Sequence, residues 1–281
     1  MPGSENNQLE NVLTKQSFWT FNQEEKHRIA HWLDDAIRND RFEIYYQPLY
    51  TVCDGRFTEA EALLRLKDPN GEYISPEKFI PIAEDSGQII EIGCMVLKHV
   101  CQYISHLLSC NINIDTISVN LSVVQLMGEN AVPRLLKIIR DNGISPNRIL
   151  FVVTESILIR NYTLIAEKIM ELSRAGIQFA LDDFGTGYSN IINVIDLPFD
   201  VVKIDKSLIW DSMKNQRCNI MIRELTRTFH NIDLTVVAEG VETEKHDQFV
   251  HQCGCDKIQG FRYAKPMPVS RAMDYFGRQA I

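Results

Sequence analysis

The stretch of residues 161–184, NYTLIAEKIMELSRAGIQFALDDF, has the pattern of a helix followed by a strand. Its first part predicts a helix over Asn161–Ala175, which Gly176 ends because glycine readily takes the left-handed conformation that follows a helix. Its second part predicts a short buried strand over Gln178–Phe184 that closes on two acidic residues. Strands that alternate with helices in this way are typical of parallel α/β folds.

The same alternation extends in both directions along the chain. Further helices are expected from Ser75 onward and over Gln23–Asn39, Ile89–Leu108, Val132–Asp141, Ser189–Asp196, Asn215–His230, Glu242–Cys253 and Ser270–Gln279. Further strands are expected over Phe42–Val52, Phe57–Lys67, Thr116–Ser122, Ile149–Glu155, Val201–Asp205, Thr235–Val241 and Lys257–Tyr263. Asp54-Gly55 joins the first two strands as an antiparallel hairpin. We predict an α/β fold, a single (β/α)8 barrel of the TIM type with an antiparallel first strand, and keep a doubly wound open sheet as the alternative.

Composition and termini limit the class of protein. The chain has 281 residues, 45% of them hydrophobic, and a formal net charge of −8. Because an acidic chain repels polyanions, we expect no nucleic-acid partner. Residues 1–21 are polar and lack the features of a signal peptide, so we predict a tail or linker there and one domain over 22–281. Without an apolar run long enough to insert into a membrane or a disulfide framework among its seven cysteines, the chain is expected in the cytoplasm.

Polar side chains recur at the carboxyl ends of the predicted strands. Because alternate residues of a barrel strand point inward, Ser118 and Asn120 are expected to face the interior. The same alternation, together with the position of Asp183 directly after Asp182 at a strand end, brings acidic, amide and lysine side chains from five strands to one rim. These residues are Glu61, Asn120, Asp182, Asp183, Lys203 and Glu239. A lone strand-end aspartate usually caps a helix, but this whole set lies where barrel enzymes carry their active sites.

The chemistry of this set indicates a metal site. Carboxylate and amide oxygens are hard ligands that suit Mg²⁺ or Mn²⁺, and the adjacent Asp182 and Asp183 can serve two ions at once. Two divalent ions about 3.5–4 Å apart suit the hydrolysis of a phosphodiester. Lys203 can add a positive charge near the attacked phosphate or orient the water. Metal ions would also allow an acidic chain to hold an anionic ligand.

The motifs around these residues resemble the EAL family of bacterial c-di-GMP phosphodiesterases. The tripeptide that names the family is Glu61-Ala62-Leu63, and Arg65 follows it. The other family-like blocks are Tyr46-Gln47-Pro48, Phe79–Glu84, Ser118–Ser122, Thr154-Glu155-Ser156, Asp182–Ser189, Lys203-Ile204-Asp205, Ala238–Glu242 and Gln259-Gly260-Phe261. They stand in family-like order from near residue 25 to near residue 280, which makes the resemblance specific.

The resemblance implies a function and a role for each matched residue. Family members cleave one phosphodiester bond of c-di-GMP to give linear pGpG, and they commonly form homodimers. By resemblance, the metal ligands are Glu61, Asn120, Asp182, Asp183 and Glu239. Lys203 is the catalytic lysine, and Glu61 and Glu239 take part in catalysis with it. The dinucleotide contacts are Gln47, Leu63, Arg65 and Gln259, while Glu155 stabilises the loop from Phe184 to Ser189.

One position departs from the family pattern. The family has Glu-x-Thr-Glu, in which the first glutamate is a metal ligand, whereas this chain has Val152-Val153-Thr154-Glu155. Val152 has the parity to point inward but offers no oxygen. Water can fill a gap in the coordination of Mg²⁺ but cannot replace a negative charge, so metal affinity is expected to fall. We therefore expect weakened catalysis with ligand binding retained.

Two other functions remain open at this point. The first is a catalytically degenerate barrel of the same family that acts as a c-di-GMP receptor or protein-interaction module, which the change at Val152 favours. The second is a Schiff-base aldolase that uses Lys203. That chemistry needs no acidic cluster, so it leaves Arg65, Asp182 and Asp183 without a role.

Overall fold

The computed structural model describes residues 23–154, 162–186 and 191–278. Eight strands form its central sheet: β1 (Glu43–Thr51), β2 (Arg56–Lys67), β4 (Thr116–Asn120), β5 (Ile149–Thr154), β6 (Gln178–Phe184), β7 (Val201–Ile204), β8 (Thr235–Ala238) and β9 (Lys257–Ile258). From β2 to β9 the neighbours are parallel, while β1 is antiparallel to both β2 and β9 and closes the ring. The predicted barrel with an antiparallel first strand is confirmed, and the open sheet is excluded.

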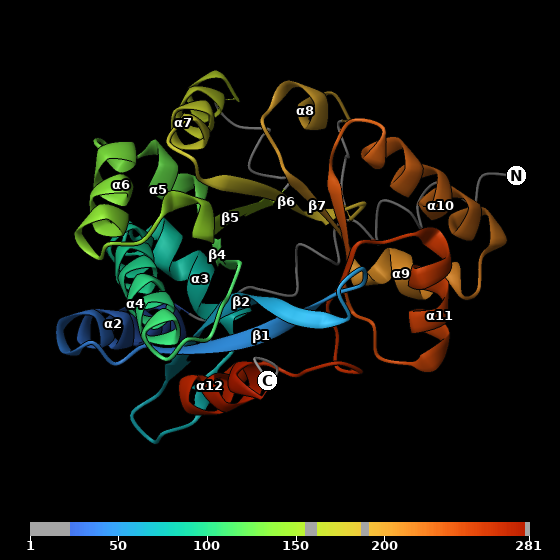
Figure 1. Cartoon of the computed structure of the whole chain (residues 1–281). Coiled ribbons are helices and arrows are strands. Elements are labelled where there is room, and N and C mark those ends of the chain that lie inside the picture. The colour runs from blue at the N-terminus through green and yellow to red at the C-terminus, as the bar shows by residue number, and fades with distance from the viewer. Residues whose placement is uncertain (1–22, 155–161, 187–190, 279–281) are drawn as a thin grey trace, which may run out of the picture.

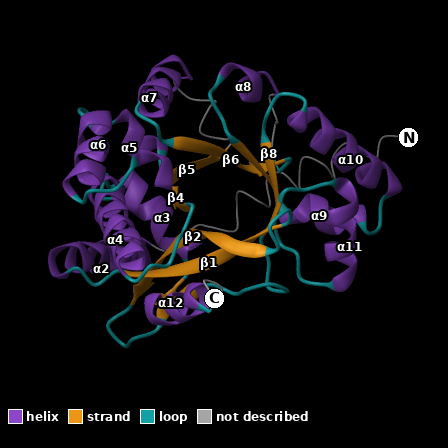
Figure 2. Ribbon diagram, in the orientation of Figure 1, coloured by secondary structure: helices purple, strands orange, loops and turns teal. Residues whose placement is uncertain are grey.

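Helices surround this barrel (Figures 1 and 2). In chain order they are α2 (Gln23–Asn39), α3 (Pro76–Asp85), α4 (Ile89–Ser109), α5 (Val123–Met127), α6 (Ala131–Asp141), the 3₁₀ turn η1 (Pro146–Arg148), α7 (Tyr162–Arg174), α8 (Ile191–Asp196), α9 (Lys206–Ser212), α10 (Gln216–His230), α11 (Glu244–Cys253) and α12 (Val269–Gly277). Two short strands, β3 (Tyr73–Ile74) and β10 (Met267–Pro268), extend the sheet beside β2 and β1. The helices bury the outer face of the barrel, as amphipathic helices must.

Several strands end earlier than the sequence predicts. The strand expected to reach Ser122 stops at Asn120, because the Ser122 hydroxyl accepts a hydrogen bond from Val124 N (3.2 Å) and caps the unpredicted helix α5. Asp205 caps the unpredicted α9 in the same way, by accepting from Ser207 N (2.8 Å). The last barrel strand stops at Ile258 rather than Tyr263. Side chains that compete for the backbone therefore set the first two of these ends.

Two hydrophobic layers lie on opposite sides of the barrel wall. The larger one fills the space between strands and helices and contains Ile117, Val119 and Leu121. The smaller one lies inside the barrel and consists of Leu49, Leu150, Val152, Ala180, Val201 and Val237. Because successive residues of a strand alternate between faces, the side chains two positions after Ala180 and Val201 also point inward, nearer the carboxyl ends. Asp182 and Lys203 are those side chains.

Gly260 is a place where the fold tolerates no side chain. A Cβ at this position would lie far inside van der Waals distance of the Val241 backbone, whose N–H donates to Gln259 O (3.2 Å). We expect Gly260→Ala to lower the free energy of unfolding by about 1–3 kcal/mol, because the backbone must shift to admit the methyl group. Thermal denaturation measures this loss. Gly277→Ala, whose Cβ would make an ordinary contact with Ile112, is the control, and equal melting temperatures for the two variants would contradict the prediction.

Candidate active site

The carboxyl ends of the strands surround the ammonium group of Lys203. This side chain is only 2% exposed, and its Nζ lies 2.6 Å from Glu239 Oε1, 3.1 Å from Glu61 Oε2 and 3.3 Å from Asp182 Oδ1. The carboxylates come from β2, from β6 and from the residue that follows β8, while Lys203 lies on β7. A buried lysine thus holds three carboxylates together at one end of the barrel.

Asp183 joins this cluster through an unusual backbone conformation. Simple alternation would turn Asp183 away from the side that Asp182 faces, but its φ is 56°, in the left-handed region that non-glycine residues rarely adopt. Carboxylate oxygens of Asp182, Asp183 and Glu239 consequently lie within 4.8 Å of one another. Backbone strain of this kind is often retained at functional sites. The structure therefore places two adjacent carboxylates where they can share one or two cations.

Amide side chains complete the cluster on its other flank. Asn120 Nδ2 donates to Glu61 Oε1 (3.0 Å), which leaves its own carbonyl oxygen available as a ligand. Gln259 Nε2 donates to Glu61 Oε2 (2.8 Å) and to Gln47 Oε1 (3.1 Å), and Gln47 in turn donates to Ala264 O (3.1 Å). Gln259 Oε1 is buried without a donor among the described residues. The set offers hard oxygen atoms and an unsatisfied acceptor, so it fits Mg²⁺ or Mn²⁺.

Burial and mutual repulsion shift the pKa values of these groups. Burial alone would lower the pKa of Lys203, but Asp182, Glu239 and Glu61 raise it well above its ordinary value. Burial raises the pKa of Glu239 to about 8, although Lys203 opposes the shift. Burial and the neighbouring Asp182 raise the pKa of Asp183 to about 6. For Glu61, Lys203 and the amide donors outweigh burial and lower the pKa. The cluster carries more acid groups than one lysine can neutralise.

Protons should therefore compete with metal ions for this site. A carboxylate must be deprotonated to bind a cation, so raising the pH from 6 to 8, across the pKa values of Asp183 and Glu239, should strengthen Mn²⁺ binding. Each proton released contributes up to about tenfold in affinity per pH unit. Calorimetric titration at several pH values measures the slope. The Glu239→Gln variant has no proton to lose at this position, so its affinity should change less with pH near pH 8 than that of the wild type. An affinity independent of pH in the wild type would refute the expectation.

A cavity of about 1010 Å³ reaches the cluster at Asn120, the hydrogen-bond partner of Glu61. Leu63, Arg65, Asn120 and Val152 all line it, so four of the residues singled out from the sequence share one wall. Helices α3, α4 and α5 supply the opposite wall, with Ile80, Glu84, Gly93 and Gln125 among its residues. This space is large enough for a nucleotide-sized ligand.

Sequence reasoning assigned no role to several residues of this region. Glu84 lines the cavity and accepts a hydrogen bond from the Ser122 hydroxyl (2.6 Å). Asp205 is buried beside the cluster and helps to raise the pKa of Asp183. Both lie in the motifs quoted above, which was the available signal. Glu155, expected to stabilise the loop after β6, lies outside the described residues.

Val152 occupies the position where the departure from the family pattern was noted. It is 1% exposed, lies inside the barrel, and pairs across the sheet with Asn120 on β4 and with Ala180 on β6. Its side chain also lines the cavity. The inward orientation agrees with its parity in the sequence, and an apolar side chain therefore borders the oxygen ligands at this point.

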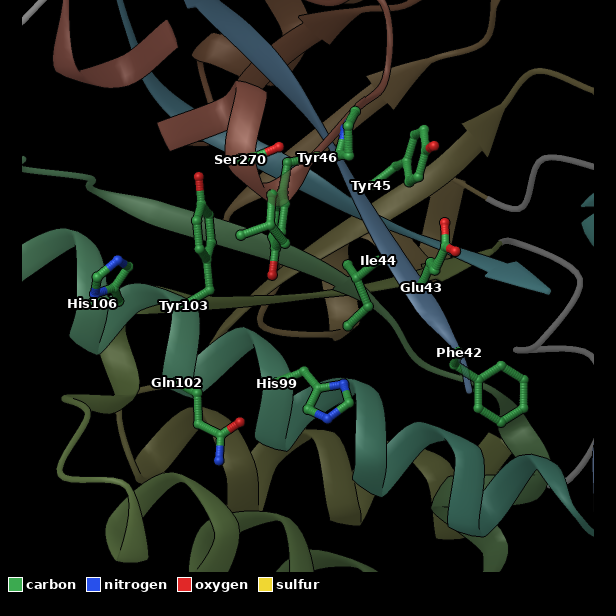
Figure 3. A pocket seen from close by; sticks show the side chains of 12 residues that line it. Phe42, Glu43, Ile44, Tyr45, Tyr46, His99, Gln102, Tyr103, His106 and Ser270 are labelled. Carbon is green, nitrogen blue, oxygen red and sulfur yellow. The ribbon is translucent and has the colours of Figure 1, made fainter. Parts of the chain in front are cut away.

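A second cavity, of about 520 Å³, lies on the outer side of β1 (Figure 3). Tyr46, His99, Tyr103 and Ser270 line it, and the rings of Tyr46 and Tyr103 are stacked with centroids 4.1 Å apart. No cluster of acidic oxygens borders it among the described residues. Within residues 23–154, 162–186 and 191–278, the acidic group suited to a metal therefore lies at the mouth of the barrel.

The closed ring of strands and the acidic group at its carboxyl end define an α/β barrel with a metal-type site. The EAL domain profile matches residues 30–266, and the chain belongs to the EAL domain family. The resemblance inferred from the motifs is thereby confirmed. The bounds predicted for the tail and for the domain remain predictions.

Relatives and solved structures agree with this assignment. The cyclic di-GMP phosphodiesterase PdeR of Escherichia coli is 35% identical over 241 residues, which cover 84% of this chain and 36% of PdeR. The oxygen sensor protein DosP of the same species is 33% identical over 236 residues, covering 84% of this chain and 30% of DosP. The chain spans about a third of the length of the curated relatives it matches.

A solved complex of the PaMucR phosphodiesterase with c-di-GMP superposes with a TM-score of 0.82 at 31% identity, covering 87% of this chain and 99% of that chain. The FimX EAL domain from Pseudomonas aeruginosa bound to c-di-GMP gives 0.79 at 21% identity, covering 88% and 98%, and supports the fold alone. Homologues of this chain are thus c-di-GMP phosphodiesterases. Within the described part of the chain, every helix is too short or too polar to span a bilayer.

Proposed function

We propose that this EAL domain binds c-di-GMP and hydrolyses one of its phosphodiester bonds to give linear pGpG, with activity weakened at Val152. The observation that carries the proposal is the group of three carboxylates around Lys203. It is joined through the hydrogen bond of Glu61 with Asn120 to the wall of a cavity of about 1010 Å³. Relatives that share the family are named as phosphodiesterases for this dinucleotide. The fold alone would not support a substrate, because barrels serve many reactions.

The residues around the cluster would divide the work as follows. Asp182, Asp183, Glu239, Glu61 and Asn120 would hold two Mg²⁺ or Mn²⁺ ions. When bound, such ions activate water and stabilise negative charge on phosphorus. The positive charge of Lys203 would stabilise the same developing charge.

The walls of the site would bind the rest of the dinucleotide. Leu63 and Arg65 lie on the cavity wall, where a base and a phosphate of the ligand would contact them. Gln47 and Gln259 are hydrogen-bonded to each other, and Gln259 also donates to Glu61. The two amides would therefore contact the ligand while they fix the position of the Glu61 carboxylate.

A receptor that binds c-di-GMP without hydrolysis is the second candidate function. The buried apolar Val152 beside the ligand set favours it, because one carboxylate of the family pattern is missing. Incubation of the protein with c-di-GMP and Mn²⁺, followed by chromatography for pGpG, separates the two. We expect pGpG to accumulate and to require the metal. Binding of c-di-GMP without any pGpG would instead establish the receptor.

Two further expectations, a homodimer from the family and a location from the sequence, accompany this proposal. The domain would form a homodimer, which sedimentation velocity of the purified chain would detect. It would act in the cytoplasm, as the absence of a recognisable signal peptide in the sequence led us to expect. Neither expectation changes the assignment of the site residues.

A further inference from the structure

Three cross-strand pairs of side chains, which we call the ladder, extend along β1 and β2 from the ligand cluster to the rim of the barrel. The two strands pair so that Gln47 lies opposite Glu61, Tyr45 opposite Leu63 and Glu43 opposite Arg65. Side chains that are two residues apart on a strand share a face, so these pairs stand on the face of the sheet that carries the cluster. Figure 3 shows Glu43 and Tyr45 on one side of β1 and Ile44 and Tyr46 on the other.

Arg65 is held on this ladder by a ring rather than by a carboxylate. Its guanidinium carbon lies 5.4 Å from the centroid of the Tyr45 ring, and its Nη1 donates to Leu64 O (2.9 Å). Arg65 forms no ion pair with any residue that the structure describes. A half-buried guanidinium that lines the cavity therefore keeps its full charge, because the quadrupole of a ring attracts a cation without neutralising it.

The Tyr45 ring is itself fixed by a chain of neighbours. Its hydroxyl lies 2.8 Å from the Tyr73 hydroxyl, and the two rings meet edge to face with centroids 5.9 Å apart. Tyr73 in turn donates to Glu43 Oε2 (2.8 Å). Lys67 donates to the other oxygen of Glu43 (2.6 Å) and lies over the Tyr73 ring at 4.8 Å. Glu43 is thus occupied by Lys67 and Tyr73, and it makes no ion pair with Arg65, its cross-strand partner.

We propose that Tyr45, locked in place by Tyr73 and Glu43, is a positioning residue that holds the Arg65 guanidinium toward the cavity and leaves its charge free for an anionic phosphate of the ligand. This inference rests on the proposed function, since it assigns a task at the same site. Tyr45 and Tyr73 would act through Arg65 and not on the reacting atoms. The expected signature is weaker ligand binding with an unchanged chemical step.

The test is a double-mutant cycle on c-di-GMP binding in EDTA, where the metal-dependent reaction is stopped. Tyr45→Leu removes the ring and should raise the Kd on the order of tenfold, as expected for a partly desolvated cation–π contact. Tyr45→Phe keeps the ring and should recover most of the affinity. In an Arg65→Ala background, Tyr45→Leu should have no further effect, because the residue it positions is gone. With metal present, Tyr45→Leu should raise KM and leave kcat unchanged.

Controls separate a positioning role from a structural one. Tyr50→Leu makes the same substitution on the same strand, where the ring stacks on Tyr263 instead (4.7 Å), and should leave the Kd unchanged. If Tyr45→Leu fails to fold, Tyr73→Leu replaces it in the test. Tyr73 contacts Tyr45 from an exposed position, and its loss should also raise the Kd for c-di-GMP.

Three results would overturn the inference: equal Kd values for the wild type and Tyr45→Leu, an equal loss in the Arg65→Ala background, or a Kd unaffected by Arg65→Ala alone. Failure of the wild type to bind c-di-GMP would instead overturn the proposed function.

Discussion

Replacing Val152 with glutamate should raise the turnover of c-di-GMP on the order of tenfold when Mg²⁺ is limiting, the size of effect that ligand-supporting residues have on metal sites. The side chain at this position points into the barrel beside Asn120 and lines the cavity. A carboxylate there would add one oxygen ligand and one negative charge to the cluster. The gain should shrink as Mg²⁺ saturates, because the added charge acts mainly on metal affinity.

The matched control is Val152→Gln, which supplies a similar shape and an oxygen without the charge. If charge is what the site lacks, glutamine should give a much smaller gain than glutamate. Without metal, Val152→Glu should be less stable than the wild type, since an unpaired buried carboxylate is costly, and Mg²⁺ should restore that stability. Turnover equal to that of the wild type at limiting Mg²⁺ would show that Val152 does not limit metal binding.

Lys203→Met should lower kcat about 10²- to 10³-fold, the usual cost of losing a charge that stabilises the transition state. The substitution also removes the cation that three carboxylates share. Breaking a buried ion pair costs about 3–5 kcal/mol, so the metal-free variant should unfold at a lower temperature. Divalent cations should recover stability but not turnover, because they replace the charge among the carboxylates and not the amine.

Lys137→Met provides the comparison, since this exposed lysine on α6 pairs with Asp141 at the surface and should change neither property. Thermal melts with and without Mn²⁺, together with initial rates of pGpG formation, measure both effects. If Lys203→Met retained wild-type kcat, the lysine would have no role in the reaction and would serve only to hold the carboxylates together.

The alternation of strands and helices was sufficient to predict the barrel, because most of the parallel strands are short, largely apolar and bounded by polar turns. Parity along the strands likewise predicted that Asn120, Asp182 and Lys203 face inward. Strand alternation alone would turn the Asp183 side chain away from the cluster. Its backbone instead takes a positive φ at the end of β6, and its carboxylate lies beside that of Asp182. That conformation depends on packing around the strand end, which neighbouring residue types do not reveal.

The residues that the helices contribute to the cavity wall could not be predicted either, because they too depend on tertiary packing. Glu84 and Gln125 reach the site from α3 and α5, and how far a helix lies from a strand depends on tertiary packing. The hydrogen bond between Gln47 and Gln259 also joins strands at opposite ends of the chain. Periodicity places a residue on a face, whereas contacts between distant segments need the closed fold.

The closure of the ring by β1 determines when the site can exist during synthesis. Gln47 and Gln259 are 212 residues apart, and β1 meets β9 only after nearly the whole domain has left the ribosome. Contacts between such distant segments form late and slowly. A nascent or C-terminally truncated chain should therefore carry every carboxylate of the cluster and still lack an assembled cation pocket, so cation binding at this site waits until the last strand has docked.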